Sequence, residues 1–198
     1  MTDEYRALEL HPLPAGSSFC RPWQEFPARV AMDSPALETM TDLRQMTAVT
    51  IPPNAPIDKA LDKMIKTGVR LLLVINEERA VLGVITARDI QGEKPMKFQQ
   101  DMGVSRGEVL VRDVMTPQNK LAVMLMDDLL DATVGDVVMT LKKDCRQHAL
   151  VVDKHKDSGV ETLRGIFSAT QISRMLGIEV RFDDISKTFE ELRKHLEK

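Results

Sequence analysis

An internal repeat constrains the fold of this 198-residue chain more than any other feature. Residues 55–76 and residues 132–153 align without a gap at an offset of 77 positions, and their apolar residues coincide. In both copies these residues recur at spacings of three and four, which is typical of one face of a helix. Self-similarity of this kind indicates one structural unit that occurs twice. We therefore expect two similar units that pack together.

The order of elements within each copy follows from the length and the pattern of its apolar runs. The helical faces consist of Ile57, Ala60, Leu61 and Met64 in one copy and of Val134, Val137, Val138 and Leu141 in the other. Short aliphatic runs after each helix predict strands, the first of them buried on both faces. The expected strands are 48–51, 71–75 and 81–86 in the first copy and 121–126, 148–152 and 163–168 in the second. Each copy ends in a further helix, at 87–91 and at 169–176, the latter stopped by Gly177.

These elements predict an α/β fold of two β-α-β-β-α repeats related by pseudo-twofold symmetry. A three-stranded sheet with helices on one face needs cover on the other, so the cleft between the repeats is the natural ligand site. The predicted divisions are an extended tail and lead-in over 1–45, repeat one with a polar connector over 46–106, repeat two over 107–178, and an amphipathic helix over 179–198.

The two flanking segments differ from the repeats. The proline-rich tail carries half of the chain's aromatic residues, which are Tyr5, Phe19, Trp23 and Phe26. A freely solvated linker rarely carries so many, so we expect the tail to dock on its own domain, on a dimer mate or on a partner protein. The apolar spacing of the last helix comes from Ile185, Phe189, Leu192 and Leu196. We expect this helix to close the core or a dimer contact.

Composition excludes several classes of function. A net charge of −3 and a pI near 5.8 argue against a nucleic-acid partner. The longest apolar runs are too short to cross a membrane, and the N-terminal residues lack the pattern of a secretory signal. Two cysteines fit a reducing compartment. We therefore expect a cytoplasmic protein with no membrane partner.

One motif carries chemistry, and it ends the second long strand of each copy. The first copy reads Gly83-Val-Ile-Thr86-Ala-Arg88-Asp89, and the second reads Gly165-Ile-Phe-Ser168-Ala-Thr-Gln171. A glycine lets a ligand or a neighbouring backbone approach the strand, and free N–H groups at the following helix start favour an anion. The arginine suits a phosphate, and the carboxylate suits two adjacent hydroxyl groups.

The same spacing has a purely structural interpretation. Thr86 and Asp89 are spaced as a helix capping box, and so are Ser168 and Gln171. We expect capping in both copies, whereas an amide at Gln171 favours diol binding only in the first.

The repeated motif and the lead-in Val111-Arg-Asp-Val-Met-Thr-Pro117 resemble a tandem pair of cystathionine beta-synthase (CBS) domains, the Bateman module, over residues 46–177. The resemblance implies that Thr86 and Asp89 bind the phosphate and the ribose of an adenosine ligand. It implies an equivalent role for Ser168 in the second cleft. It places the base near Thr50, Ile51, Pro52, Val69 and Arg70. It also implies a homodimer.

The sequence therefore predicts a non-catalytic sensor that binds AMP, ADP or ATP, or else S-adenosylmethionine, without an obligatory cofactor, and signals to a separate protein. The alternative is an interaction or scaffold module that has lost ligand binding, for which Gln171 is the strongest argument. No nucleophile or phosphate-loop motif indicates an enzyme. Cys145, His148 and His155 fall on different predicted elements, so we expect no metal site.

Overall fold

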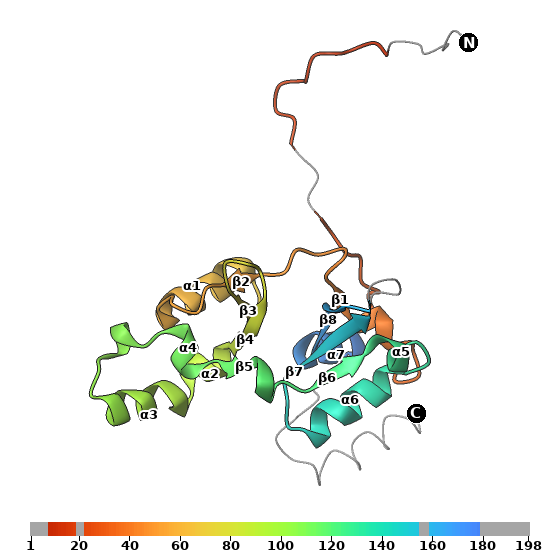
Figure 1. Cartoon of the computed structure of the whole chain (residues 1–198). Coiled ribbons are helices and arrows are strands. Elements are labelled where there is room, and N and C mark those ends of the chain that lie inside the picture. The colour runs from red at the N-terminus through yellow and green to blue at the C-terminus, as the bar shows by residue number, and fades with distance from the viewer. Residues whose placement is uncertain (1–7, 19–21, 155–158, 179–198) are drawn as a thin grey trace.

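The computed structural model of the chain describes residues 8–18, 22–154 and 159–178, which form two units of similar order (Figure 1). The first unit comprises β2 (Thr50–Ile51), α1 (Ile57–Thr67), β3 (Leu71–Ile75), β4 (Val81–Thr86), α2 (Ala87–Gln91) and α3 (Glu93–Met102). The second comprises β6 (Val123–Leu125), α5 (Met126–Leu129), α6 (Val134–Lys143), β7 (His148–Lys154), β8 (Glu161–Ser168) and α7 (Ala169–Leu176). The lead-in segments contain β1 (Thr41–Asp42), α4 (Val111–Val114) and β5 (Thr116–Pro117), with short 3-10 turns at 36–39, 106–108 and 118–120. The predicted β-α-β-β-α order is confirmed in both copies.

Each unit has a four-stranded sheet, and each sheet takes its edge strand from the lead-in of the other repeat. The orders are β2-β3-β4-β5 and β1-β8-β7-β6. Strand β5, which leads into the second repeat, pairs antiparallel with β4 of the first. Strand β1, which precedes the first repeat, pairs antiparallel with β8 of the second. The two units are therefore interlocked by exchanged lead-in segments.

The first helix of each unit forms for reasons that are visible in the sequence. Helix α1 ends at Gly68, whose φ of 69° is a left-handed conformation that glycine adopts freely. Helix α6 begins with a capping box between Thr133 and Asp136. The predicted apolar faces are confirmed, because Ile57 and Val134 and the residues that follow them at helical spacing are buried.

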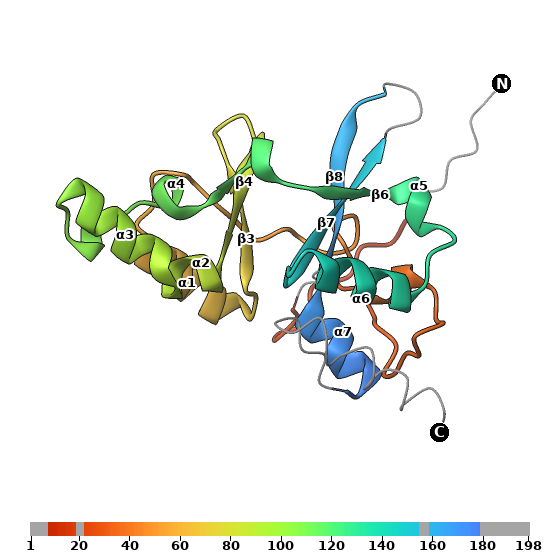
Figure 2. The ribbon, with the colours of Figure 1, turned by 90° about the horizontal axis from the view of Figure 1, so that it is seen from below.

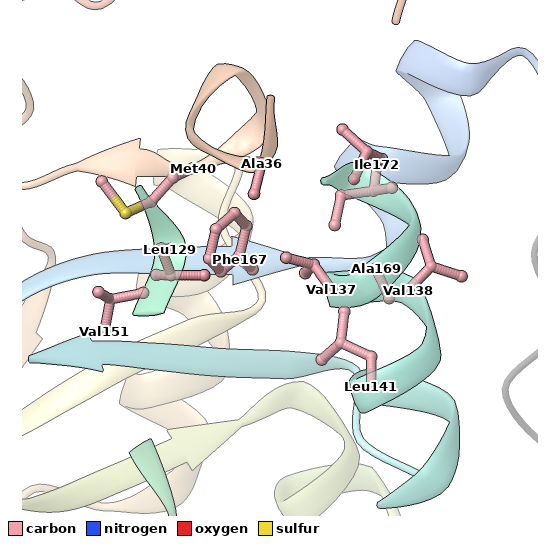
Figure 3. Close-up of a cluster of buried hydrophobic side chains, with 11 residues drawn as sticks. Ala36, Met40, Leu129, Val137, Val138, Leu141, Val151, Phe167, Ala169 and Ile172 are labelled. Atoms are coloured by element: carbon pink, nitrogen blue, oxygen red, sulfur yellow. The ribbon is translucent and has the colours of Figure 1, made fainter. Parts of the chain in front are cut away.

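Strand β3 is buried on both faces, as its unbroken aliphatic run predicts. Leu72 and Val74 point into the core of the first unit, and Leu71 and Leu73 pack against the second unit. The core of the second unit is built around Phe167, which is fully buried beneath α6 and α7 (Figure 3). Figure 2 shows β3 and β4 beside β7 and β8 in the middle of the molecule, with the helices to either side.

The connector predicted over 92–106 contains a helix that the sequence did not indicate. Helix α3 occupies Glu93–Met102 and ends at Gly103 in a left-handed conformation. Its apolar residues are few and its partly buried Phe98 packs on the first core, so the amphipathic signal is weak.

Residues 22–36 of the tail dock on the second unit through both apolar and polar contacts, because Val30, Met32 and Ala36 pack on its core. The buried side chain of Gln24 donates to the carbonyl oxygen of Met40 at 2.8 Å and accepts from the Asp42 N–H at 2.7 Å. The backbone N–H of Val30 donates to the Met175 carbonyl oxygen at 3.1 Å. Docking on the chain's own domain is thus observed, but Trp23 remains 73% exposed.

Some predictions fall on residues that the structure leaves undescribed. Tyr5, Phe19 and the C-terminal helix predicted over 179–198 lie outside the described residues. Among the residues that are described, no helix is long and apolar enough to span a membrane.

Candidate functional site

A cavity of about 300 Å³ lies where the two units meet at the end of β4. This first cavity is in the size range of small-molecule sites. One wall comes from the motif at the start of α2, and the opposite wall comes from the turn between α6 and β7. Its lining consists of Leu71, Val84, Thr86, Arg88, Asp89, Thr116, Leu121, Ala122, Cys145, Arg146, Gln147, His148 and Leu150.

The motif in this cavity forms a complete capping box for α2. The Thr86 backbone N–H donates to Asp89 Oδ2 at 2.9 Å, the Thr86 hydroxyl donates to the same oxygen at 2.6 Å, and the Asp89 N–H donates to Thr86 Oγ1 at 3.2 Å. The other carboxylate oxygen, Oδ1, accepts from Lys94 Nζ at 2.5 Å. Lys94 comes from α3 and also donates to the carbonyl oxygen of Val114 at 3.2 Å. Both oxygens of Asp89 are therefore engaged within the protein.

Positive charge dominates the remaining polar groups of the first cavity. Arg88 and Arg146 come from opposite walls, and neither forms an ion pair within residues 22–154 and 159–178. The Asp89 carboxylate is offset by Lys94. Two guanidinium groups without a local counter-charge favour an anionic ligand.

His148 lies between this cavity and a second one, and lines both. Burial and, to a smaller extent, the positive charge of Arg70 lower the pKa of His148 to about 4, with Asp89 acting in the opposite sense. The imidazole is therefore neutral at physiological pH.

The second cavity, of about 290 Å³, is the counterpart of the first across the pseudo-twofold relation. It lies between the start of α7, the turn after α1 and the lead-in segment of the first repeat. Its lining consists of Thr41, Leu43, Met46, Thr47, Ala48, Val49, Gly68, Val69, Arg70, Leu71, Leu73, His148, Ile166, Ser168, Thr170, Gln171 and Arg174.

The expectation of capping in both copies is wrong for the second. Ser168 precedes α7 but its side chain makes no capping hydrogen bond. The Nε2 atom of Gln171 is buried and has no hydrogen-bond partner in the described structure. Asp89 accepts two charge-assisted hydrogen bonds from Thr86, which are stronger than bonds to the neutral amide oxygen of Gln171 would be.

The structure divides the predicted site residues instead of bringing them together. Thr86, Arg88 and Asp89 share the first cavity, and Val69, Arg70 and Ser168 share the second. The remaining four lie elsewhere. Thr50 lines a wider third cavity between the hairpins, Ile51 is buried in the first core, Pro52 is exposed in a turn, and Gly83 packs against β5.

Sequence reasoning missed the wall of the first cavity that comes from the second unit. Arg146 and Gln147 stand 77 positions after Val69 and Arg70, so the repeat itself carried the signal. Each motif faces the turn of the opposite copy, because the units meet through a twofold relation. When the offset of 77 positions is applied to the turn after the first helix, and not only to the motif, it identifies Arg146 and Gln147.

The described residues contain no group of three or more histidine, cysteine or acidic side chains that could hold a metal ion. Cys145 is an exposed free thiol on the first cavity, and His155 lies outside the described residues.

The comparisons with known proteins agree with this architecture. Residues 37–93 match the family model of the CBS domain. An uncharacterized conserved protein from Pyrococcus horikoshii has a similar structure, with 20% identity, a TM-score of 0.53 and coverage of 77% of this chain and 98% of its own. A CBS-domain containing protein from Agrobacterium tumefaciens has 19% identity and a TM-score of 0.52 over 73% of this chain and 94% of its own. CBSX2 from Arabidopsis thaliana, solved in complex with AMP, has 21% identity and a TM-score of 0.48 over 71% and 94%.

The two units together have the fold of a CBS-domain pair. The fold expected from the repeated motif is confirmed, and the match to the CBS-domain family model covers residues 37–93.

Proposed function

We propose that the chain is a non-catalytic regulatory module that binds an adenosine nucleotide in the first cavity and signals its presence to a separate protein. The observation that carries the proposal is the composition of that cavity. Thr86, Arg88 and Asp89 of one unit line the cavity of about 300 Å³ together with Arg146 and His148 of the other unit. A ligand bound there would contact both units at once.

The side chains that line the first cavity offer suitable contacts for the base, the phosphate and the ribose of a nucleotide. Aliphatic side chains such as Leu121 and Leu150 offer an apolar surface to a base, and the two arginines offer paired donors to phosphate. Asp89 Oδ1 is the carboxylate oxygen that a ribose diol would approach, with Lys94 displaced or sharing it. The uncompensated positive charge favours AMP, ADP or ATP over the sulfonium cation of S-adenosylmethionine.

Signalling requires that the ligand bind two arrangements of the units with different affinity. The exchanged strands β1 and β5 link each cavity wall to the opposite unit, so a change at one wall can shift the orientation of both. We further propose a homodimer as the signalling form. Light scattering should then give about twice the chain mass of 22.3 kDa, and a mass near one chain would contradict the dimer.

The first test is thermal unfolding with AMP, ADP, ATP and S-adenosylmethionine. A ligand at 100 times its dissociation constant adds about 2.7 kcal/mol, which corresponds to a rise of about 5 to 10 °C for a domain of this size. Asp89→Asn should abolish most of the rise.

The matched control is Asp136→Asn. Asp136 forms the same capping box with Thr133, with bonds of 2.8, 2.6 and 3.3 Å, but lines neither cavity at the junction. Both variants lose one cap, so a loss of ligand stabilisation in Asp89→Asn alone separates binding from capping. Equal ligand responses in the two variants would show that Asp89 serves only as a cap.

A scaffold function is the second candidate, and two observations favour it. Asp89 is already satisfied by Thr86 and Lys94. Trp23 in the tail is 73% exposed, and three leucines further towards the N-terminus are exposed as well. These apolar side chains could contact a partner protein. No rise in melting temperature with any of the four ligands would favour this candidate.

A further inference from the structure

The third cavity is larger than the first and the second, with a volume of about 830 Å³, and its lining is mainly aliphatic. It lies between the β3–β4 and β7–β8 hairpins, which project to the same side of the molecule (Figure 2). Equivalent positions of the two repeats supply its walls, with Leu73 and Ile75 from β3 and Leu150 and Val152 from β7. Val123 on the edge strand β6 also lines it and is 45% exposed. An apolar hollow of this size favours an apolar occupant.

The N-terminal part of the tail carries three exposed leucines. Leu8, Leu10 and Leu13 are 81%, 93% and 83% exposed. Residues 8–18 run away from the two units (Figure 1). Among the described residues, the hydrogen bonds of this segment are confined to one turn, in which Ser17 donates to the carbonyl oxygen at position 14. A solvated segment rarely carries so many large apolar side chains, so these leucines need a surface to cover.

This segment suits an elongated apolar groove. Leu8 and Leu10 alternate with polar residues, so an extended backbone places both leucines on one face. Pro12 and Pro14 restrict their own backbone and that of the residues before them to extended conformations. The segment therefore loses less conformational freedom on binding than a flexible chain would.

The tail is anchored beside the third cavity. The buried side chain of Gln24 bonds to Met40 and to Asp42, and the next residue of the chain, Leu43, lines the cavity. Ten residues join Leu13 to Gln24, and an extended chain of this length spans about 35 Å. The tether holds the leucines near the cavity of their own chain at an effective concentration in the millimolar range.

The charged groups at the cavity are compatible with this occupant. Arg79 lines the cavity from the turn of the β3–β4 hairpin and forms no ion pair within the described part of the chain. Glu9, between the first two leucines, provides an acid for Arg79. Glu161 also lines the cavity, and the segment has a histidine, His11, where a second acid would be repelled.

From these observations we infer that residues 8–14 dock in the third cavity of their own chain. The described conformation is then the open form, and in the closed form the three leucines fill the space between the hairpins. Because both repeats supply the walls, closure holds the two units in one relative orientation. Closure also withholds the leucines from any partner protein. The inference does not depend on the proposed function, because its tests use the chain without a nucleotide.

The first test places a fluorescent reporter on the segment. The chain has a single tryptophan, so Leu10→Trp combined with Trp23→Phe moves the only indole to position 10. We expect emission at a shorter wavelength than in the same chain with Val123→Glu, which adds a charge to the cavity. Leu130→Glu is the matched control, because Leu130 is an exposed leucine of the same unit that does not line the cavity. Emission typical of a solvated indole in all three chains would overturn the inference.

The second test measures whether the tail already occupies the cavity. A synthetic peptide of residues 8–18 is titrated calorimetrically into the full chain and into a variant with Leu8→Ser, Leu10→Ser and Leu13→Ser. If the closed form makes up about nine tenths of the wild type, the peptide binds the wild type about tenfold more weakly than the variant. Equal binding to both chains, or no binding to the variant, would contradict docking. Thermal unfolding shows whether each variant is folded.

Dilution separates the chain's own cavity from that of a second copy. Docking within one chain does not depend on protein concentration, so the emission maximum of the Leu10→Trp reporter should stay constant on dilution. A shift to longer wavelength on dilution would mean that the segment docks in a second copy, and docking within one chain would be wrong.

Discussion

The same four-residue spacing gives different results in three places, and the chemistry of the fourth residue decides which. Thr86 with Asp89 and Thr133 with Asp136 close complete capping boxes. Ser168 with Gln171 leaves the cap open and a buried amide unpaired. The two closed boxes have a carboxylate at the fourth position, whose charge-assisted hydrogen bonds are stronger than those to the neutral amide oxygen of Gln171.

Lys94 is the residue that most directly controls the availability of Asp89. Its Nζ atom donates a hydrogen bond to Oδ1 of Asp89, the carboxylate oxygen that the capping box does not use. We expect Lys94→Met to tighten the binding of adenosine about two- to fivefold, because partly exposed ion pairs are worth up to about 1 kcal/mol. Calorimetry with adenosine measures this, since an uncharged ligand does not respond to the lost positive charge.

Lys97→Met on the same helix is the control for Lys94→Met. Lys97 pairs with Glu93 on the exposed face of α3, away from the cavity. Weaker adenosine binding in Lys94→Met than in Lys97→Met would mean that Lys94 holds the site open instead of blocking it.

At the scale of elements, the exchange of lead-in strands depends on two close approaches. Gly83 lies against β5, where an added Cβ would overlap the carbonyl oxygen of Thr116 and lie 3.0 Å from Cα of Pro117. Gly165 lies against Met40, where a Cβ would overlap the side-chain sulfur. The obstacle is backbone in the first case and a movable side chain in the second.

This difference predicts unequal effects of the same substitution. Gly83→Ala should lower the free energy of unfolding by about 2 kcal/mol or more, because β5 must move away from β4. Gly165→Ala should cost about 1 kcal/mol or less, because Met40 can adopt another rotamer. Urea denaturation of both variants measures this. Equal losses would mean that Gly83 does not set the spacing between β4 and β5.

An ion-pair cluster fixes the other exchanged strand. Asp42 on β1 accepts two hydrogen bonds of 2.7 Å from Arg164 on β8, and Arg164 also contacts Asp153 at 3.2 Å. The hydrogen bonds from Arg164 hold the pKa of Asp42 well below its usual range. Strand β1 has two residues, so these side-chain contacts add to a short backbone ladder.

The local spacing of apolar residues predicted the helices and strands, but it did not predict which distant strands pair with one another. Helices α1, α6 and α7 and strands β3, β4 and β8 follow from apolar spacing within short windows. The pairing of β5 with β4 and of β1 with β8 leaves no periodic signal, because each edge strand is two residues long. The family resemblance assigned Val69 and Arg70 to one ligand site with Thr86, whereas they line the other cavity.

At the scale of the whole molecule, the two cavities share a wall. Leu71 and His148 stand at equivalent places in the two repeats, 77 positions apart, and both line both cavities. Leu71 also belongs to the apolar cluster that joins the two sheets. A titratable group at this junction can therefore link the stability of the interface to pH.

The sign of that link follows from the lowered pKa of His148. Its pKa is about 4 in the folded chain and about 6.5 in the unfolded chain, so between these values only the unfolded chain binds the proton. The stabilising contribution is complete above about pH 6.5 and is lost as the pH falls towards 4.

We expect His148→Leu, which copies the leucine of the other repeat, to remove this dependence. The wild type should lose about 1 to 2 kcal/mol more than the variant in urea denaturation between pH 7 and pH 5. His11→Leu is the control, because His11 lies in the exposed part of the tail and should leave the pH profile unchanged. Parallel profiles for the wild type and His148→Leu would mean that the pKa of His148 is the same in the folded and the unfolded chain, and the shared wall would then gain a positive charge below about pH 6.5.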